Sequence, residues 1–285
     1  MKRSLHIALA FLIATLIVTQ AQAQRRQKVI FLQSYNNAPY HFGYLIGVNF
    51  MDYSLHLNEN YQNAIHPKNE FPDGQDASFQ GDDLDHFQIL NVESRAKPGF
   101  SVGVIGDLKL SEYFNLRFSP TLSLSSKYVT YTTMLYDASG NIIPICYYEN
   151  GQQYTKETKE ITSDDQLATF LEFPIHIKYR SKRYNNIGAY IIAGANPKLY
   201  LASRKTKIGS DGNPALLQTN RGDVAVEVGA GFDIFNQWFK MGVELKFSYG
   251  MINVMKDDVL SMGYIYNSPL NSVKNKQLQL SFTFE

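Results

Sequence analysis

Cysteine and net charge are both scarce in this chain. Cys146 is the only cysteine among 285 residues, which excludes an intrachain disulfide. The 27 Lys and Arg residues nearly cancel the 26 Asp and Glu residues and leave a formal net charge of +1. A chain this close to neutral has no overall attraction for a polyanion, so we expect no nucleic-acid partner.

Long apolar runs are absent after residue 23, which excludes transmembrane helices from the rest of the chain. The first 23 residues have the order of a secretory signal peptide: Lys2 and Arg3, an apolar stretch over 5–18, and Ala-Gln-Ala at 21–23. An anchoring helix is the alternative, but the apolar stretch is short for a bilayer. We predict a signal peptide over 1–23.

Motifs for catalysis and cofactor binding are also lacking. The sequence has no glycine-flanked serine elbow, no paired metal-binding histidines and no glycine-rich phosphate loop. His176 follows the polar face of a predicted strand, which favours a place in a polar network over catalysis. The aspartates of one long polar segment do not have the spacing of a helix-flanked calcium loop: Asp73, Asp76, Asp82, Asp83 and Asp85. We therefore expect no catalytic residues, no cofactor, no metal site and no enzymatic activity.

What the chain does have is alternation of apolar and polar residues, clearest over 98–127. The apolar residues there occupy even positions on both sides of a short turn: Phe100, Val102, Val104, Leu108, Leu110, Phe114, Leu116, Phe118, Leu122 and Leu124. Each arm keeps the pattern for about ten residues, the length with which a tilted strand crosses a bilayer, whereas soluble strands usually have about five or six. We predict a transmembrane hairpin with its apolar face in lipid.

Similar alternation recurs along the chain. With the two arms of the hairpin it predicts eight strands, at 41–50, 100–110, 114–124, 167–180, 186–201, 223–235, 239–251 and 277–285. The facing of 186–201 stays open, because both parities carry apolar residues. From Tyr53 the apolar residues move to odd positions, which predicts a bulge or the strand leaving the membrane. Residues 137–141 predict a turn at the tip of a hairpin.

Short and long connections alternate between these strands. Three are only a few residues long and carry Tyr113, Tyr184 and Trp238, as an interfacial aromatic girdle would. Four are long polar excursions: 58–97, 132–166, 203–222 and 252–273. The alternation predicts an all-β fold, an eight-stranded antiparallel transmembrane up-and-down β-barrel with short periplasmic turns and four long extracellular loops. Nothing divides 24–285, so we predict one outer-membrane β-barrel domain there, surrounded by outer-membrane lipid.

Inward-facing positions of the predicted strands carry a nearly balanced set of acids and bases. A barrel of this size is filled by side chains, and charges held away from water need opposite charges close by. A turn centred on Glu112 and a two-residue turn at 236–237 set the pairing of the strands that they join. Three cross-strand ion pairs are predicted in the interior: Asp107 with Arg117, Asp233 with Lys240, and Glu227 with Lys246. We expect such a filled barrel to conduct poorly.

Several blocks of the sequence resemble the PorT family, small outer-membrane barrels of the Bacteroidota type IX secretion system. They are HFGYLIGVNFMDYSL at 41–55, PGFSVGVIGDLKLSEYFNLRFSPTLSL at 98–124, LEFPIHIKYRSKRYNN at 171–186, FKMGVELKFSYGMINV at 239–254 and LSFTFE at 280–285. The likeness covers most of the predicted strands and none of the loops between them. The final residue, Glu285, departs from the aromatic residue that usually ends an outer-membrane barrel.

The resemblance implies a function in protein secretion. A member of this family is needed to export cargo proteins that carry C-terminal sorting signals and to attach them at the cell surface, and gliding motility often depends on the same system. The resemblance implies other type IX secretion components as partners and no cofactor. The barrel-assembly machinery is a further expected partner during biogenesis. The alternative is a small structural or adhesive outer-membrane barrel that binds external ligands through its long loops.

Overall fold

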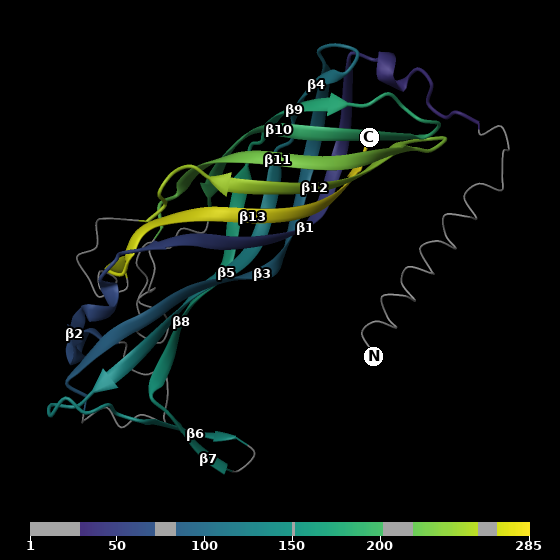
Figure 1. The fold of residues 1–285 in the computed structure, drawn as a ribbon. Coiled ribbons are helices and arrows are strands. Elements are labelled where there is room, and N and C mark those ends of the chain that lie inside the picture. The colour runs from purple at the N-terminus through teal and green to yellow at the C-terminus, as the bar shows by residue number, and fades with distance from the viewer. Residues whose placement is uncertain (1–28, 72–83, 150–151, 202–218, 256–266) are drawn as a thin grey trace, which may run out of the picture.

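The computed structural model describes residues 29–71, 84–149, 152–201, 219–255 and 267–285 (Figure 1). The predicted signal peptide over 1–23 lies outside the described residues, as do the aspartates of the polar segment other than Asp85. No helix in the described part of the chain is long and apolar enough to cross a bilayer. The described residues include three short 3-10 helices: η1 (Tyr35–Asn37), η2 (Tyr61–Asn63) and η3 (Lys68–Glu70).

The fold is all-β, and every strand pair is antiparallel. The strands are β1 (Tyr40–Leu57), β2 (Ile65–Pro67), β3 (His86–Lys109), β4 (Phe114–Phe118), β5 (Thr121–Tyr136), β6 (Ile145–Glu149), β7 (Gln152–Lys156), β8 (Thr158–Glu172), β9 (Ile175–Arg180), β10 (Ile187–Tyr200), β11 (Gly222–Phe235), β12 (Lys240–Gly250) and β13 (Leu270–Phe284). The short connections lie at one end of the molecule, called the short-turn end below, and the long ones at the other, the long-loop end (Figure 1).

The strand pairings can be followed from β1 around the structure. One edge of β1 pairs with β13, and the pairing continues through β12 and β11 to β10. β10 pairs with β9 and, over its last residues, with β8. β9 pairs with β4, and β8 pairs with β5. Both β4 and β5 pair with β3, and β3 pairs with the other edge of β1.

Two neighbouring strands are interrupted by proline at the same level. The sequence predicts one strand over 114–124 and one over 167–180, but the structure breaks them at Ser119–Pro120 and at Phe173–Pro174. Proline has no backbone N–H to donate to a neighbouring strand, so the ladder is weakened at both points. The Ser119 N–H donates to Pro174 O at 3.2 Å and joins the two interruptions.

Side chains alternate between inward and outward positions along most strands, and in β3 the alternation shifts at two irregularities, between Ile89 and Asn91 and between Ala96 and Phe100. In β1 the even-numbered residues from Tyr40 to Phe50 are exposed, while the odd-numbered ones face inward. In β10, whose facing the sequence left open, Tyr190 and Ile192 are buried and the odd-numbered residues are exposed. The inward set of β10 is therefore the one that contains the large tyrosine ring.

Two of the predicted loops, 58–97 and 132–166, are partly strand. The described residues 86–97 belong to β3, residues 132–136 belong to β5, and 158–166 belong to β8. The prediction of a solvated surface loop was wrong for 86–97, because Phe87 and Ile89 of β3 have no exposed surface. The predicted hairpin turn at 137–141 is present, and the Gly140 N–H donates to Asp137 O at 3.0 Å. In Figure 1, β3, β5 and β8 extend past the other strands toward the long-loop end, beside β2, β6 and β7.

A cluster of buried apolar residues fills the molecule at the long-loop end. We call it the outer core, and its members are Tyr53, Phe71, Leu84, Phe87, Ile89, Val92, Val129, Tyr131, Leu135, Ile161, Val254, Leu270 and Val273. It explains the change of pattern at Tyr53. No bulge occurs there, because the pairing of β1 with β13 runs without a shift from Tyr44 to His56. The odd-numbered residues of β1 face inward on both sides of Tyr53, and the side chains that they meet inside change from polar to apolar.

The turn between β11 and β12 corrects one predicted register. Phe235 pairs with Lys240, and the Asn236 N–H donates to Phe239 O at 3.0 Å. The prediction of a two-residue turn at 236–237 was therefore wrong. All partners shift by two positions, and Asp233 lies opposite Gly242. A slip of two residues keeps every side chain on the same face, which is why alternation alone did not detect it.

Candidate functional site

Arg117 on β4 is the centre of the charged interior near the short-turn end. It is 1% exposed and binds Asp107 of β3, directly opposite, through two parallel bonds of 2.9 Å from Nε and Nη2. Its Nη1 donates to Glu244 of β12 at 3.0 Å, and Nη2 also donates to Glu285 at 3.2 Å. One guanidinium thus crosses the interior and joins three carboxylates from three directions.

Asp233 on β11 belongs to the same charged layer. Its Oδ2 lies 3.0 Å from the Lys178 Nζ of β9 and 3.8 Å from the Lys240 Nζ of β12. Lys240 is closer to Glu285, whose Oε2 is 2.8 Å away. Each of these charges is almost fully buried, and each has an opposite charge in contact, as burial of charge requires.

Two tyrosines supply further donors to this layer. The hydroxyl of Tyr35, from η1, donates to Glu285 Oε2 at 3.0 Å, and that of Tyr190 donates to Glu244 Oε2 at 2.9 Å. The Tyr190 ring also lies under the Lys178 ammonium, 3.8 Å from Nζ to the ring centroid. Hydroxyl donors suit a layer whose ion pairs leave carboxylate oxygens with room for another bond.

A second charged layer lies farther from the short turns, around Glu227 of β11. Its Oε2 accepts from His176 Nε2 at 2.8 Å and lies 3.0 Å from Lys246 Nζ. Its Oε1 accepts from Asn196 Nδ2 at 2.7 Å, and the same amide nitrogen reaches Glu172 Oε2 at 2.7 Å. His176 therefore sits in a hydrogen-bonded polar network.

The structure brings together the acid and base of each pair singled out from the sequence, although only one pair is directly opposite. Asp107 faces Arg117 across the strands. Glu227 reaches Lys246 diagonally at 3.0 Å, and Asp233 reaches Lys240 at 3.8 Å but has a closer partner in Lys178. Diagonal contacts suffice here because lysine side chains are long enough to span two positions.

Sequence reasoning missed two residues of the inner layer. Glu285 was noted only because it is not aromatic, yet its side chain is buried and bound to Lys240 and Arg117. Its alternation with Phe284 could have placed it among the inward residues. Tyr35 had no such signal, since it precedes the first strand and belongs to no periodic pattern.

Residues 29–39 lie across the mouth of the interior at the short-turn end. Tyr35 stacks on His41, with ring centroids 4.0 Å apart. Arg183, between β9 and β10, donates to the carbonyl oxygens of Phe31 and Leu32. Lys109 Nζ donates to Asn36 O at 2.8 Å. The segment is thus held on three sides and brings Tyr35 into contact with the charged layer.

The arrangement fills space and neutralises charge. Among the residues that the structure describes, no three His, Cys, Asp or Glu side chains are placed to hold a metal ion together. The buried charges contact one another across the interior, in two layers that draw on β3, β4, β9, β11 and β12. These ion pairs link strands on opposite sides of the structure.

Comparisons with known proteins bear on the fold. Residues 20–256 match the model of a family described as "Outer membrane protein beta-barrel domain". Among solved structures, the outer membrane protein OprG from Pseudomonas aeruginosa is similar over 85% of this chain and 92% of its own, with 8% identity and a TM-score of 0.35. No curated protein sequence matches the chain.

Proposed function

Because the chain belongs to the outer membrane protein beta-barrel domain family, we propose that it is a closed eight-stranded barrel with an accessory role in type IX secretion. In this proposal the barrel is not an enzyme and not the conducting pore. The short-turn end faces the periplasm and the long-loop end faces outward, as in outer-membrane barrels generally. The family assignment supports an outer-membrane location, and the signal peptide over 1–23 is the proposed route to it.

The pairing of β1 supports closure, because β1 is bonded to β13 on one side and to β3 on the other. Counting β4 with β5 as one spanning strand, and β9 with β8 as another, gives eight spanning strands along the path of pairings. Closure removes the unpaired strand edges that a bilayer does not tolerate.

Outward-facing side chains support a position in lipid. Exposed apolar residues follow one another on several strands, among them Phe42, Tyr44, Ile46, Val48 and Phe50 of β1, Val224, Val226 and Val228 of β11, and Leu278, Leu280 and Phe282 of β13. Soluble monomers rarely expose such continuous apolar surface, whereas a barrel in lipid requires it. Tyr184 and Trp238, both strongly exposed in the short turns, suit the level of the lipid headgroups.

The observation that carries the accessory role is the filled interior. Arg117 binds the carboxylates of Asp107 on β3, Glu244 on β12 and Glu285 just after β13, and Tyr35 adds the N-terminal segment to the same layer. A folded or extended polypeptide cannot pass through a space that these side chains already occupy. The barrel therefore suits a component that assembles with or supports a separate conduit, with its loops or turns contacting partners.

The assignment to type IX secretion rests on the sequence resemblance to the PorT family. It gives the other components of that system as proposed partners and the barrel-assembly machinery as the partner during insertion. The second candidate function is an adhesive or structural barrel, which the β6–β7 hairpin favours. This hairpin carries stacked rings of Tyr147 and Tyr154, with centroids 5.6 Å apart, beyond the main body of strands (Figure 1).

Deletion of the gene tests the secretion role. We expect cargo with C-terminal sorting signals to be lost from the medium and the cell surface, and the wild-type gene to restore it. Normal export and surface attachment in the deletion strain would eliminate the role and leave the adhesive candidate. Altered lipid A or surface peptides in the same strain would contradict the non-enzymatic part of the proposal.

Reconstitution in planar bilayers tests the filled interior separately. We expect the purified barrel to show little conductance, because buried and paired charged side chains occupy its interior. A variant that lacks residues 29–37 isolates the contribution of the N-terminal segment, and the exposed substitution Lys276→Gln is the matched control. Large, stable open currents from the wild type would contradict the accessory assignment.

A further inference from the structure

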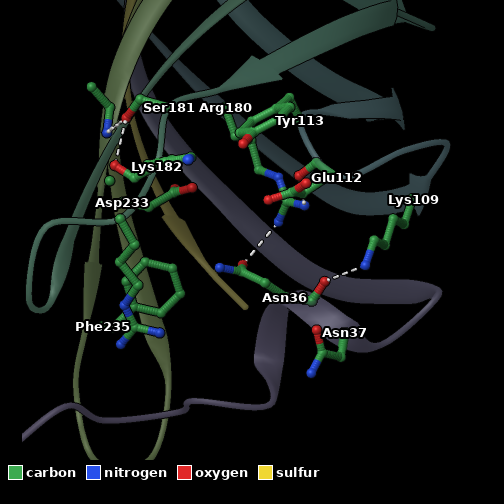
Figure 2. Close-up of a pocket in the computed structure, with 13 residues that line it drawn as sticks. Asn36, Asn37, Lys109, Glu112, Tyr113, Arg180, Ser181, Lys182, Asp233 and Phe235 are labelled. Atoms are coloured by element: carbon green, nitrogen blue, oxygen red, sulfur yellow. Dashed lines mark hydrogen bonds between the residues drawn. The ribbon is translucent and has the colours of Figure 1, made fainter.

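A cavity of about 370 Å³ opens at the short-turn end, beside the N-terminal segment (Figure 2). Its walls come from η1, the connection between β3 and β4, the connection between β9 and β10, and the end of β11. This volume lies within the range of about 300–1,000 Å³ that ligand sites usually have.

The cavity is lined by more cations than acids. The lining includes four cations, Lys109, Arg180, Lys182 and Arg183, and two acids, Glu112 and Asp233. Asp233 is already neutralised from inside by Lys178 and Lys240. Within the described part of the chain, none of the four lining cations makes an ion pair with a carboxylate, although the cations of the inner charged layer all do. The mouth therefore carries positive charge that the protein does not itself compensate.

The four lining cations differ in how many of their N–H donors already have acceptors. Arg183 is occupied by backbone carbonyls of the N-terminal segment. Lys109 gives one bond to Asn36 O, and an ammonium has two more protons to donate. Figure 2 shows Asn36 between Lys109 and Arg180, bonded to both, with its side-chain oxygen 2.8 Å from Arg180 Nη1. Lys182 is exposed at the rim.

Arg180 has one buried donor without an acceptor. Its Nη1 and Nη2 donate to Asn36 Oδ1 and Glu112 O, but Nε has no hydrogen-bond partner. Nε and Nη2 form the edge of a guanidinium that binds a carboxylate in parallel, and Arg117 uses this edge on Asp107 in the same protein. The same edge of Arg180 lacks its carboxylate.

We propose that this cavity is a binding site for a carboxylate side chain of an acidic polypeptide segment that approaches the short-turn end. Arg180 and Lys182 would hold the carboxylate, with Lys109 supplying a further ammonium. Lys109, Arg180 and Asp233 all lie on inward-facing positions of their strands, so the site belongs to the mouth of the interior and not to the lipid-facing wall. That position favours a polypeptide over a lipid headgroup. Its exposure to the periplasm rests on the proposed topology, but binding itself does not.

Binding to the purified, detergent-solubilised full chain tests the proposal. The probe is a short peptide of alternating Glu and Gly, and its counterpart with Gln in place of Glu is the neutral control. Calorimetry or fluorescence anisotropy should detect the acidic peptide only, with affinity falling as salt is raised. We expect the double substitution Arg180→Gln and Lys182→Gln to weaken binding by about tenfold or more, because it removes two charge-assisted contacts.

Matched variants separate charge from geometry. Lys274→Gln with Lys276→Gln removes two cations from β13 outside the cavity and should leave binding unchanged. Arg180→Lys keeps the charge but loses the parallel edge and should bind with intermediate affinity. Heat-modifiable migration on gels confirms that each variant is folded before its affinity is compared.

Three results would overturn the site. They are equal binding of the acidic and neutral peptides, equal binding by the wild type and the Arg180 and Lys182 double variant, and binding of phosphatidylglycerol vesicles with none of the acidic peptide. The last would assign the cations to a lipid surface. A loss of secretion in cells without any peptide binding would leave the proposed function standing and remove this site alone.

Discussion

The charged interior and the outer core share the strands β3, β5 and β13 but are built in opposite ways. On β5 the inward residues nearest the short-turn end are Thr121, Ser123 and Ser125, followed by Lys127, and then by Val129 and Tyr131 of the outer core. The backbone alternation does not change along this strand. Only the chemistry of the inward side chains does, within a few residues of Lys127.

The difference teaches that the surroundings set the polarity of the inside. Where the outer surface faces lipid, the apolar residues point outward and the polar residues must satisfy one another within. In the proposed placement the strands extend beyond the lipid at the long-loop end, so water covers the outside there and the apolar residues turn inward as in a soluble domain. Lys127 marks the boundary: its Nζ donates to Asn275 and lies 3.7 Å from the centroid of the Tyr53 ring.

The largest expected effect comes from removing the central cation of the charged interior. Arg117→Ala leaves the carboxylates of Asp107 and Glu244 buried without their partner. Breaking a buried ion pair on one side typically destabilises a protein by about 3–5 kcal/mol. Urea unfolding in lipid vesicles would measure it. A loss below about 1 kcal/mol, the range of exposed pairs, would mean that water reaches the layer and that the two regions are less different than described.

A cavity in the outer core should have the next largest effect. Ile161 is fully buried there, and Ile161→Ala should destabilise the protein by about 2–5 kcal/mol, with Ile161→Val as the smaller step at about 1 kcal/mol. The same urea titration applies. If the outer core unfolds independently of the membrane-spanning part, the loss will appear as faster hydrogen exchange in β8 with an unchanged global transition.

The bond between the N-terminal segment and the charged interior should contribute less. Tyr35→Phe removes only the hydroxyl that donates to Glu285 Oε2. A hydrogen bond to a charged group contributes about 1.5–3 kcal/mol. Protease sensitivity of residues 29–39 should rise in the variant, while Tyr113→Phe, in the neighbouring short turn, serves as the hydroxyl control. Equal sensitivity in both variants would contradict a role of Tyr35 as the anchor.

A partly exposed ion pair should have a smaller effect still. Lys276 Nζ lies 3.1 Å from Asp52 Oδ2, with side chains 41% and 19% exposed. Lys276→Gln should change stability by no more than about 1 kcal/mol, because solvent screens both charges. A loss as large as that from Arg117→Ala would show that distance and not burial governs ion pairs in this protein.

The smallest effect concerns a carboxylate outside the membrane-spanning strands. Backbone and side-chain donors of Asn141, with the Ser139 N–H, lower the pKa of Asp137 in the turn after β5. A carboxyl whose folded pKa is lowered stabilises the fold above its ordinary pKa, and the contribution is lost as the pH falls through the lowered value. The protection factors of the Ser139 and Asn141 amides, which are exchange rates corrected for the intrinsic pH dependence of amide exchange, should fall on acidification. Protection that does not change with pH in Asp137→Asn is the control, and unchanged protection in the acidified wild type would contradict the prediction.

The sequence supported the strand positions and faces well, because lipid outside and charge inside give a period of two that few other folds sustain. Phe100 to Leu110 and Val224 to Phe235 were placed on the right faces for this reason. Strand extensions such as 86–97 were missed, because their outward residues are polar and their inward ones are few. The register after Asn236 was missed because a shift by two leaves the faces unchanged.

Of the charged interior, the sequence could supply the members but not all the partners. Parity places Asp107, Arg117 and Lys178 inside, yet which acid a long lysine reaches depends on its rotamer and on residues from distant strands. Contacts such as Arg117 with Glu244 join residues 127 positions apart. Tyr35 enters from a segment with no periodicity, so no sequence pattern marks it.

The adjoining interruptions at Pro120 and Pro174 have a mechanical consequence. Neighbouring strands that both lack a backbone donor at one level form a weak line in the sheet, where the Ser119 N–H donates to Pro174 O. When membrane thickness or lateral pressure changes, we expect the sheet to bend along this line while the other strand pairings keep their hydrogen bonds. A sheet that bends at one level can change its curvature while the buried charged side chains keep their contacts.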